Sequence, residues 1–193
     1  MYKVFIILTA IFLISCTGTK NKNPHVLINT FYGDVEVELF LEKAPKTVAA
    51  FLSYIDSGYY KNSSFYRVLT NENLPSDANA GLIQGGIYKS NPNKLSQVPG
   101  IIHESTWQTG LSHTNGTISL ARTTPGTAST EFFICVGDQT QFDSSASAGS
   151  DGLGFAAFGK VISGMDIVLK IQNAPSHGDN FDTPINIAGI ERL

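Results

Sequence analysis

Short apolar runs separated by turn residues recur along the chain. This pattern is clearest in residues 118–136, where two apolar runs flank a segment rich in Thr, Ser, Pro and Gly. Runs of this length, bounded by such residues, are typical of β-strands joined by turns. The pattern therefore predicts a mostly β fold.

The expected elements suit a barrel. Residues 26–40 alternate apolar and polar side chains around Tyr32-Gly33-Asp34, which predicts a hairpin with one face in water. Pro45, the apolar residues that follow it at helical spacing and Gly58 predict one helix, and residues 165–171 a second. Many short strands with two amphipathic helices favour a barrel. The remaining strands are expected at residues 65–69, 82–84, 116–120, 131–136, 156–161 and 185–192.

Composition limits the classes of protein to consider. The chain has 193 residues and is 42% hydrophobic, which suits one well-packed domain and is short for two. Its formal net charge is −3 and it contains no run of Lys or Arg, so nucleic acid is not expected as a partner.

The two cysteines are Cys16 and Cys135. If Cys16 is modified, Cys135 has no partner for an internal disulfide, and its apolar neighbours predict a small buried side chain.

The N-terminus has the pattern of an export signal. Residues 1–15 combine a Lys, an apolar run and a small residue, as in a secretory signal peptide. Residues 13–16, Leu-Ile-Ser-Cys, are similar to the lipobox of bacterial lipoproteins, in which the Cys is acylated, for instance with palmitate, and becomes the new N-terminus. An ordinary signal peptide with a chance Cys is the alternative. Residues 16–24 are then expected to be the lipidated Cys and a flexible tether, and residues 25–193 the folded domain.

Several motifs together resemble the cyclophilin family of peptidyl-prolyl isomerases. They are Phe65-Tyr66-Arg67, Gln84-Gly85-Gly86, the pair Phe132-Phe133, residues 44–48 and residues 158–161. The resemblance covers nearly all of the chain after the tether. It implies a closed eight-stranded antiparallel β-barrel capped by two α-helices, with a packed interior and a ligand site on the outer wall. It also implies peptidyl-prolyl cis–trans isomerase activity (EC 5.2.1.8).

Isomerisation of an X–Pro bond forms no new bond. The peptide C–N bond has partial double-bond character, which creates a barrier to rotation of roughly 18–20 kcal/mol. A catalyst needs an apolar pocket for the proline ring and a donor that favours the twisted amide. The resemblance implies that Arg67 is this donor, that Gln84 orients Arg67 and that Phe133 is the pocket floor. Taken alone, Arg67 would suit a surface ion pair, Gln84 a turn, and Phe133 an ordinary core.

The resemblance also implies a set of substrate-binding residues along the same groove. Ala121 and Arg122 belong to a segment whose main chain pairs with the bound peptide, a mode of recognition that tolerates different side chains. The full set is Leu82, Ala121, Arg122, Glu131, Phe142 and Phe155.

Two positions depart from the family pattern. Glu131 replaces a frequent Gln; it still accepts hydrogen bonds, but its charge raises the alternative of an ion pair with Arg67. Gly81 replaces a Phe of the pocket, and extra residues precede it in the segment 70–81. An open pocket at Gly81 leaves a second hypothesis, a peptide-binding or chaperone module that has the barrel but little turnover.

No cofactor and no metal are expected, because no histidine has another His, Cys or carboxylate at ligand spacing. The four histidines are expected in loops or at strand edges: His25, His103, His113 and His177. The expected partners are proline-containing polypeptides and, through Cys16, a membrane. We expect a monomer that is exported and lipid-anchored to a bacterial cell membrane, on its periplasmic or outer-membrane face.

Overall fold

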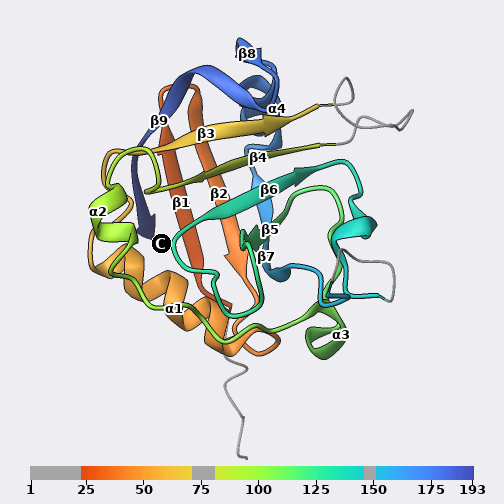
Figure 1. Ribbon diagram of the computed structural model, residues 1–193. Helices are drawn as coiled ribbons and strands as arrows, with labels where there is room; N and C mark the ends of the chain where they lie inside the picture. The colour runs from red at the N-terminus through yellow and green to blue at the C-terminus, as the bar shows by residue number, and fades with distance from the viewer. Residues whose placement is uncertain (1–22, 71–80, 146–150) are drawn as a thin grey trace, which may run out of the picture.

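The computed structural model describes residues 23–70, 81–145 and 151–193 (Figure 1). The expected signal peptide, Cys16, nearly all of the tether and most of the segment 70–81 lie outside the described residues.

Eight antiparallel strands form a closed barrel (Figure 1). The strands follow the spatial order β1-β2-β7-β5-β6-β4-β3-β9, and pairing of β1 with β9 closes the sheet. A ninth strand, β8, has two residues and pairs only with β9 among the described strands. Their bounds are β1 His25–Thr30, β2 Gly33–Leu39, β3 Ser63–Leu69, β4 Gly81–Gly86, β5 Thr117–Leu120, β6 Phe132–Val136, β7 Ala156–Ser163, β8 Ser176–His177 and β9 Asn180–Arg192. The predicted barrel is therefore confirmed.

The two predicted helices are α1, Pro45–Asp56, and α4, Met165–Gln172, and they lie at opposite ends of the barrel (Figure 1). Two four-residue helices that were not predicted, α2 Pro92–Leu95 and α3 Thr106–Thr109, lie in the long connection after β4. At the start of α2 the Asn91 side chain accepts a hydrogen bond from the Lys94 amide, and at the start of α3 the Ser105 side chain accepts one from the Gln108 amide. Such caps allow a single turn of helix to form inside a loop.

Strand alternation separates the barrel interior from its outer wall on β6. Phe132 is fully buried inside, where its ring meets those of Phe51, Tyr60 and Phe65 edge to face at 5.7–5.8 Å. Phe133 belongs to a second apolar cluster with Leu82 and other residues on the opposite face of the sheet. Successive side chains of a strand point to opposite faces, so one Phe fills the core and the next is available to the outer wall.

A buried carboxylate fastens α1 to the long connection. The helix has no side-chain cap of its own at Ala44. Instead Glu104, which is 9% exposed, accepts hydrogen bonds from the Lys46 and Thr47 amides at 3.2 and 2.8 Å and from the Thr47 hydroxyl at 2.7 Å. The first N–H groups of a helix lack intrahelical partners and attract negative charge. Glu104 thus stabilises the helix that closes one end of the barrel.

We expect Glu104→Ala to lower the free energy of unfolding by about 1–3 kcal/mol, because buried donors at the start of α1 lose their acceptor. Urea unfolding followed by circular dichroism measures this change. The matched control is Glu191→Ala, which removes an exposed carboxylate that accepts a bond from Asn29 and should change stability by less than about 0.5 kcal/mol. Equal unfolding midpoints for the two variants would contradict the capping role.

Candidate active site

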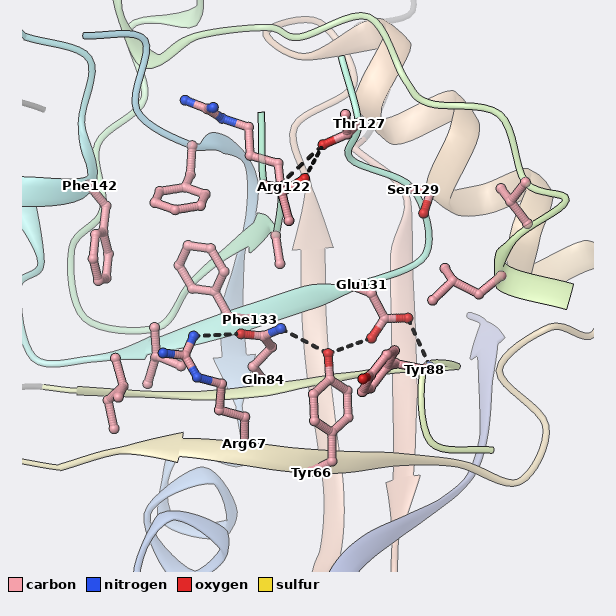
Figure 2. A pocket seen from close by; sticks show the side chains of 17 residues that line it. Tyr66, Arg67, Gln84, Tyr88, Arg122, Thr127, Ser129, Glu131, Phe133 and Phe142 are labelled. Carbon is pink, nitrogen blue, oxygen red and sulfur yellow. Dashed lines mark hydrogen bonds between the residues drawn. The ribbon is translucent and has the colours of Figure 1, made fainter. Parts of the chain in front are cut away.

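A groove on the outer wall of the barrel brings together all nine residues that were predicted to be catalytic or substrate-binding (Figure 2). Its volume is about 770 Å³. The predicted residues that line it are Arg67, Leu82, Gln84, Ala121, Arg122, Glu131, Phe133, Phe142 and Phe155. Their proximity is a property of the structure, whereas the role assigned to each stays a prediction.

The three residues expected to be catalytic form one row across neighbouring strands. Arg67 on β3 is paired with Gln84 on β4, and Gln84 is paired with Phe133 on β6. Directly opposed residues of an antiparallel pair have Cβ atoms about 4.5–5.5 Å apart. The row therefore places a guanidinium, an amide and an aromatic ring side by side along the groove.

A β-bulge in β3 decides which side chains reach the groove. The pairing of β3 with β4 shifts between Phe65 and Arg67, so Tyr66 has no opposed partner on β4. Phe65 and Val68 lie in the barrel core, while Tyr66 and Arg67 both line the groove. Regular alternation would send one of two consecutive side chains inward, and a bulge inserts one extra residue that removes this restriction.

Arg67 is held from two sides. Its Nη1 donates to Gln84 Oε1 at 3.2 Å, and its Nη2 donates to Asp179 Oδ2 at 2.9 Å. Both members of the ion pair are partly exposed, with 39% and 44% of their side-chain surfaces accessible. Asp179 was missed because no local pattern links it to Arg67: the two residues are 112 positions apart, and the turn between β8 and β9 brings them together.

Three aromatic rings enclose the apolar end of the groove. Phe133, 2% exposed, meets Phe142 and Phe155 edge to face at 5.6 and 5.4 Å, and these two rings meet each other at 5.5 Å. Edge-to-face contacts at such distances stabilise aromatic clusters beyond their buried area. The result is an apolar pocket lined by aromatic rings at this end of the groove.

Gly81 is not among the described residues that line the groove, and the backbone around it leaves no room for a side chain. Gly81 has φ +155°, and a Cβ atom there would overlap the carbonyl oxygen of Leu69 and lie 2.6 Å from Nε2 of Gln172. The main chain thus occupies the space where a side chain would start. Leu69, paired with Leu82, lines the groove as an apolar residue that the sequence analysis had not identified.

Arg122 contributes its side chain as well as its main chain. The guanidinium donates to Asp151 with two bonds of 2.7 and 2.9 Å and to the Gly154 carbonyl, and its Cζ lies 5.5 Å from the centre of the Phe155 ring. The hydrogen bonds from Arg122 lower the pKa of Asp151 to about 2. Only 7% of the Arg122 side chain is exposed. This bidentate pair covers Phe155 and keeps the ring against the pocket.

The expected alternative of an ion pair between Glu131 and Arg67 is wrong. Glu131 instead accepts hydrogen bonds from the Tyr66 hydroxyl at 2.7 Å, the Ile87 amide at 2.8 Å, the Tyr88 amide at 3.1 Å and the Thr130 hydroxyl at 3.1 Å. Burial raises the pKa of Glu131, while these hydrogen bonds act in the opposite direction.

The far end of the groove is formed by residues that the sequence analysis did not select. Leu95 is the last residue of α2, and Val98 lies three residues later, which is helical spacing. This spacing is the sequence signal that could have indicated an apolar face in this connection. Thr127 and Ser129 come from the turn-rich segment between β5 and β6. These four residues extend the groove beyond the aromatic pocket.

His113 lies in the connection before β5, as expected for a loop residue, but its side chain does not face water. It is fully buried, with Nδ1 at 2.6 Å from Asp143 Oδ1 and Nε2 at 2.9 Å from the Ser119 hydroxyl. Its ring stacks on Phe133 with centroids 5.8 Å apart. The Ser119 hydroxyl cannot serve as a nucleophile towards a substrate in the groove, because Ser119 is also fully buried. Its hydrogen bonds to Asp143 and Ser119 hold the His113 ring against Phe133, so His113 supports the floor of the pocket.

In the described part of the chain, no group of three or more His, Cys, Asp or Glu residues could hold a metal ion. No described helix is long and apolar enough to cross a membrane. Cys135 is buried, as expected, and burial raises the pKa of its thiol.

The buried His113 predicts a specific pH dependence of stability. Burial lowers its pKa below the ordinary value of 6.5, against the opposing effect of Asp143. Between these pKa values the unfolded state binds a proton that the folded state does not, so stability should fall as the pH decreases below 6.5.

Urea unfolding at about pH 7.5 and about pH 5.5 tests this expectation. We expect the wild-type protein to lose more stability over that interval than His113→Gln, which cannot bind the proton. All other titrating groups, including Asp143, are common to both proteins. The same loss in both would show that His113 does not control the acid sensitivity.

Comparisons with known proteins agree with this geometry. The family model for cyclophilin type peptidyl-prolyl cis-trans isomerase/CLD matches residues 25–192. The peptidyl-prolyl cis-trans isomerase of Acinetobacter baylyi is 36% identical over 175 residues, which are 88% of this chain and 85% of that protein. Peptidyl-prolyl cis-trans isomerase B of Escherichia coli is 35% identical over 171 residues, 87% of this chain and 97% of that protein.

A solved structure gives the same result for the fold. The crystal structure of a cyclophilin type peptidyl-prolyl cis-trans isomerase from Cryptosporidium parvum aligns with a TM-score of 0.69 at 26% identity, and covers 89% of this chain and 98% of its own. The family model, the relatives and the barrel lead to one conclusion: the chain belongs to the cyclophilin-type peptidyl-prolyl cis–trans isomerase family.

Proposed function

We propose that this protein accelerates cis–trans isomerisation of X–Pro bonds in polypeptide clients, with Arg67, Gln84 and Phe133 as its central residues. The observation that carries the proposal is the cross-strand row of these three residues beside the aromatic pocket. Family membership supports the reaction class.

The row suits the chemistry of the X–Pro bond. The proline ring would enter the apolar pocket of Phe133, Phe142 and Phe155, which excludes water from the ring. As the amide twists, its nitrogen loses conjugation and its lone pair becomes available to a donor. Arg67 keeps its charge at ordinary pH, so its guanidinium can donate to this nitrogen. A donor that is more effective for the twisted amide than for the planar one lowers the barrier.

The flanking peptide needs separate anchors. The segment that begins with Ala121 and Arg122 runs along the groove, and its backbone can pair with an extended client. Because the side chains of Arg122 and Asp151 are paired with each other, this wall remains in place without the client. Clients would thus be recognised mainly by proline and main chain.

We also propose that the protein works outside the cytoplasm as a lipid-anchored monomer. The support lies in the sequence: the signal-like residues 1–15, the lipobox-like Cys16 and the polar segment that follows. More than one acyl chain anchors a protein stably, whereas a single chain binds membranes only marginally. A tether before β1 would leave the groove accessible to exported clients that are still folding.

The proposed role of Arg67 predicts a sharp loss of turnover in Arg67→Ala. Removing one charge-stabilising donor typically costs about 10²–10³ in rate, so kcat/KM should fall by about that factor. The fold should persist, because 39% of the Arg67 side chain is exposed. The assay uses a protein of residues 17–193. It follows isomerisation of an Xaa-Pro tetrapeptide through cleavage of the peptide by a coupled protease.

The matched control is Arg192→Ala, which removes an Arg of similar exposure, 46%, that pairs with Asp56 at the end of α1. It should retain wild-type kcat/KM. Near-normal turnover in a folded Arg67→Ala protein would refute the mechanism. An inactive wild-type protein would favour a peptide-binding module instead.

The proposed anchor predicts that Cys16→Ser abolishes acylation. The full-length protein, expressed in a bacterial host with labelled palmitate, should carry label and sediment with membranes, and the variant should do neither. Cys135→Ala is the matched control and should keep the label, because Cys135 is buried in the domain. Undiminished labelling of Cys16→Ser would show that Cys16 is not the anchor.

A further inference from the structure

A continuous chain of side-chain hydrogen bonds links the guanidinium of Arg67 to the carboxylate of Glu131 (Figure 2). Arg67 Nη1 donates to Gln84 Oε1 at 3.2 Å. Gln84 Nε2 donates to the Tyr66 hydroxyl oxygen at 2.8 Å. The Tyr66 hydroxyl in turn donates to Glu131 Oε2 at 2.7 Å.

The direction of every bond in this chain follows from its two charged ends. An ionised carboxylate only accepts hydrogen bonds and a guanidinium only donates them. Tyr66 must therefore give its single proton to Glu131, which leaves its oxygen free to accept from Gln84. If the Gln84 amide were reversed, its carbonyl would face the Tyr66 oxygen and its NH₂ group would face Arg67. Both contacts would be repulsive, so the amide has one favourable orientation.

Glu131 is itself fixed in place by groups outside the chain. Its Oε1 accepts from the Ile87 and Tyr88 amides and from the Thr130 hydroxyl. Gly86 has φ +146°, and a Cβ atom there would overlap the carboxylate. The backbone at the end of β4 thus forms the binding site of the Glu131 carboxylate, and only a glycine at position 86 leaves room for it.

Tyr66 is also well fixed as the link. Tyr66 is 7% exposed, and the centre of its ring lies 5.5 Å from the centre of the Tyr88 ring. Burial and the neighbouring Glu131 raise the pKa of Tyr66, so the hydroxyl keeps the proton that it donates. The bulge in β3 places this hydroxyl on the same wall as Arg67.

The second partner of Arg67 is a weaker restraint. Asp179 is 44% exposed, and ion pairs in water contribute little to holding two side chains together. The buried route through Gln84 and Tyr66 is therefore the one that can fix the guanidinium.

We propose that Glu131 is a positioning residue which, through Tyr66, sets the orientation of the Gln84 amide and thereby holds Arg67 in the groove. This inference deepens the proposed isomerase function and rests on it. Glu131 and Tyr66 do not touch the client in this role. The charge at Glu131 matters because it makes this end of the chain a pure acceptor.

Three variants test the chain by kcat/KM in the protease-coupled assay: Tyr66→Phe, Glu131→Gln and the double variant. Tyr66→Phe removes the link, and we expect a fall of about tenfold, as for one lost hydrogen bond that positions a catalytic group. Glu131→Gln presents an NH₂ group to Tyr66 and should cost a similar factor, mainly in kcat. The double variant should be no worse than Tyr66→Phe, because Glu131 acts only through that hydroxyl.

The matched controls are Tyr54→Phe, a buried tyrosine on α1, and Glu191→Gln, an exposed carboxylate on β9. Both lie outside the groove and should keep wild-type kcat/KM. If the losses of Tyr66→Phe and Glu131→Gln multiply in the double variant, the two residues act independently and the inference is wrong. Unchanged turnover in both single variants would overturn it as well.

Nuclear magnetic resonance of ¹⁵N-labelled protein tests the same chain without turnover. The Gln84 NH₂ and Arg67 Nε–H signals, assigned through Gln84→Glu and Arg67→Lys, should shift or double in Tyr66→Phe and Glu131→Gln but not in the controls. Gly86→Ala, which displaces the carboxylate and leaves Tyr66 intact, should have the same effect if Tyr66→Phe folds poorly. Unmoved signals in folded variants would refute the inference, whereas an inactive wild-type protein with shifted variant signals would refute only the isomerase function.

Discussion

Pairing of β1 with β9 closes the sheet into a barrel, and the positions of the core and of the groove follow from this closure. β1 and β9 join Val26 to Arg192 and Ile28 to Ile190, and so close the sheet. A barrel of eight strands has an interior that side chains fill, and here Phe51 and Phe132 are among those that fill it. Because no room remains inside, a ligand has to bind on the outer wall. The groove is accordingly built on the outer faces of β3, β4 and β6.

The groove combines one exposed cationic group with an apolar floor, and the surrounding residues keep both in position. Arg67 is restrained by Gln84 and Asp179, while His113 and Arg122 pack against the rings of the aromatic pocket. Each restraint comes from a different part of the chain. Their common effect is preorganisation, which reduces the entropy that a client would otherwise have to remove on binding.

Buried carboxylates in this protein connect separate segments through hydrogen bonds. Glu104 fastens α1 to the connection after β4, and Glu131 fastens β6 to the end of β4 and to Tyr66 on β3. Each carboxylate accepts several hydrogen bonds, which is the condition under which a buried charge is tolerated. A closed barrel with long connections gains from such links, because loops packed only by apolar contacts would leave backbone N–H groups without partners.

The patterns in the sequence were enough to predict a mostly β fold and most strand positions, and the family resemblance supplied the residues of the row. Alternation placed Phe132 and Phe133 on opposite faces of their strand, and the family resemblance carried by the motifs around Arg67 and Gln84 assigned Phe133 to the outer wall. Three features were decided only by tertiary structure: the Arg67–Asp179 pair, the burial of His113 and the link from Tyr66 to Glu131. Each depends on contacts between residues far apart in the chain or on a bulge that breaks the two-residue period. Local patterns report which face a side chain prefers, but a hydrogen bond depends on the register of strands that meet only when the barrel closes.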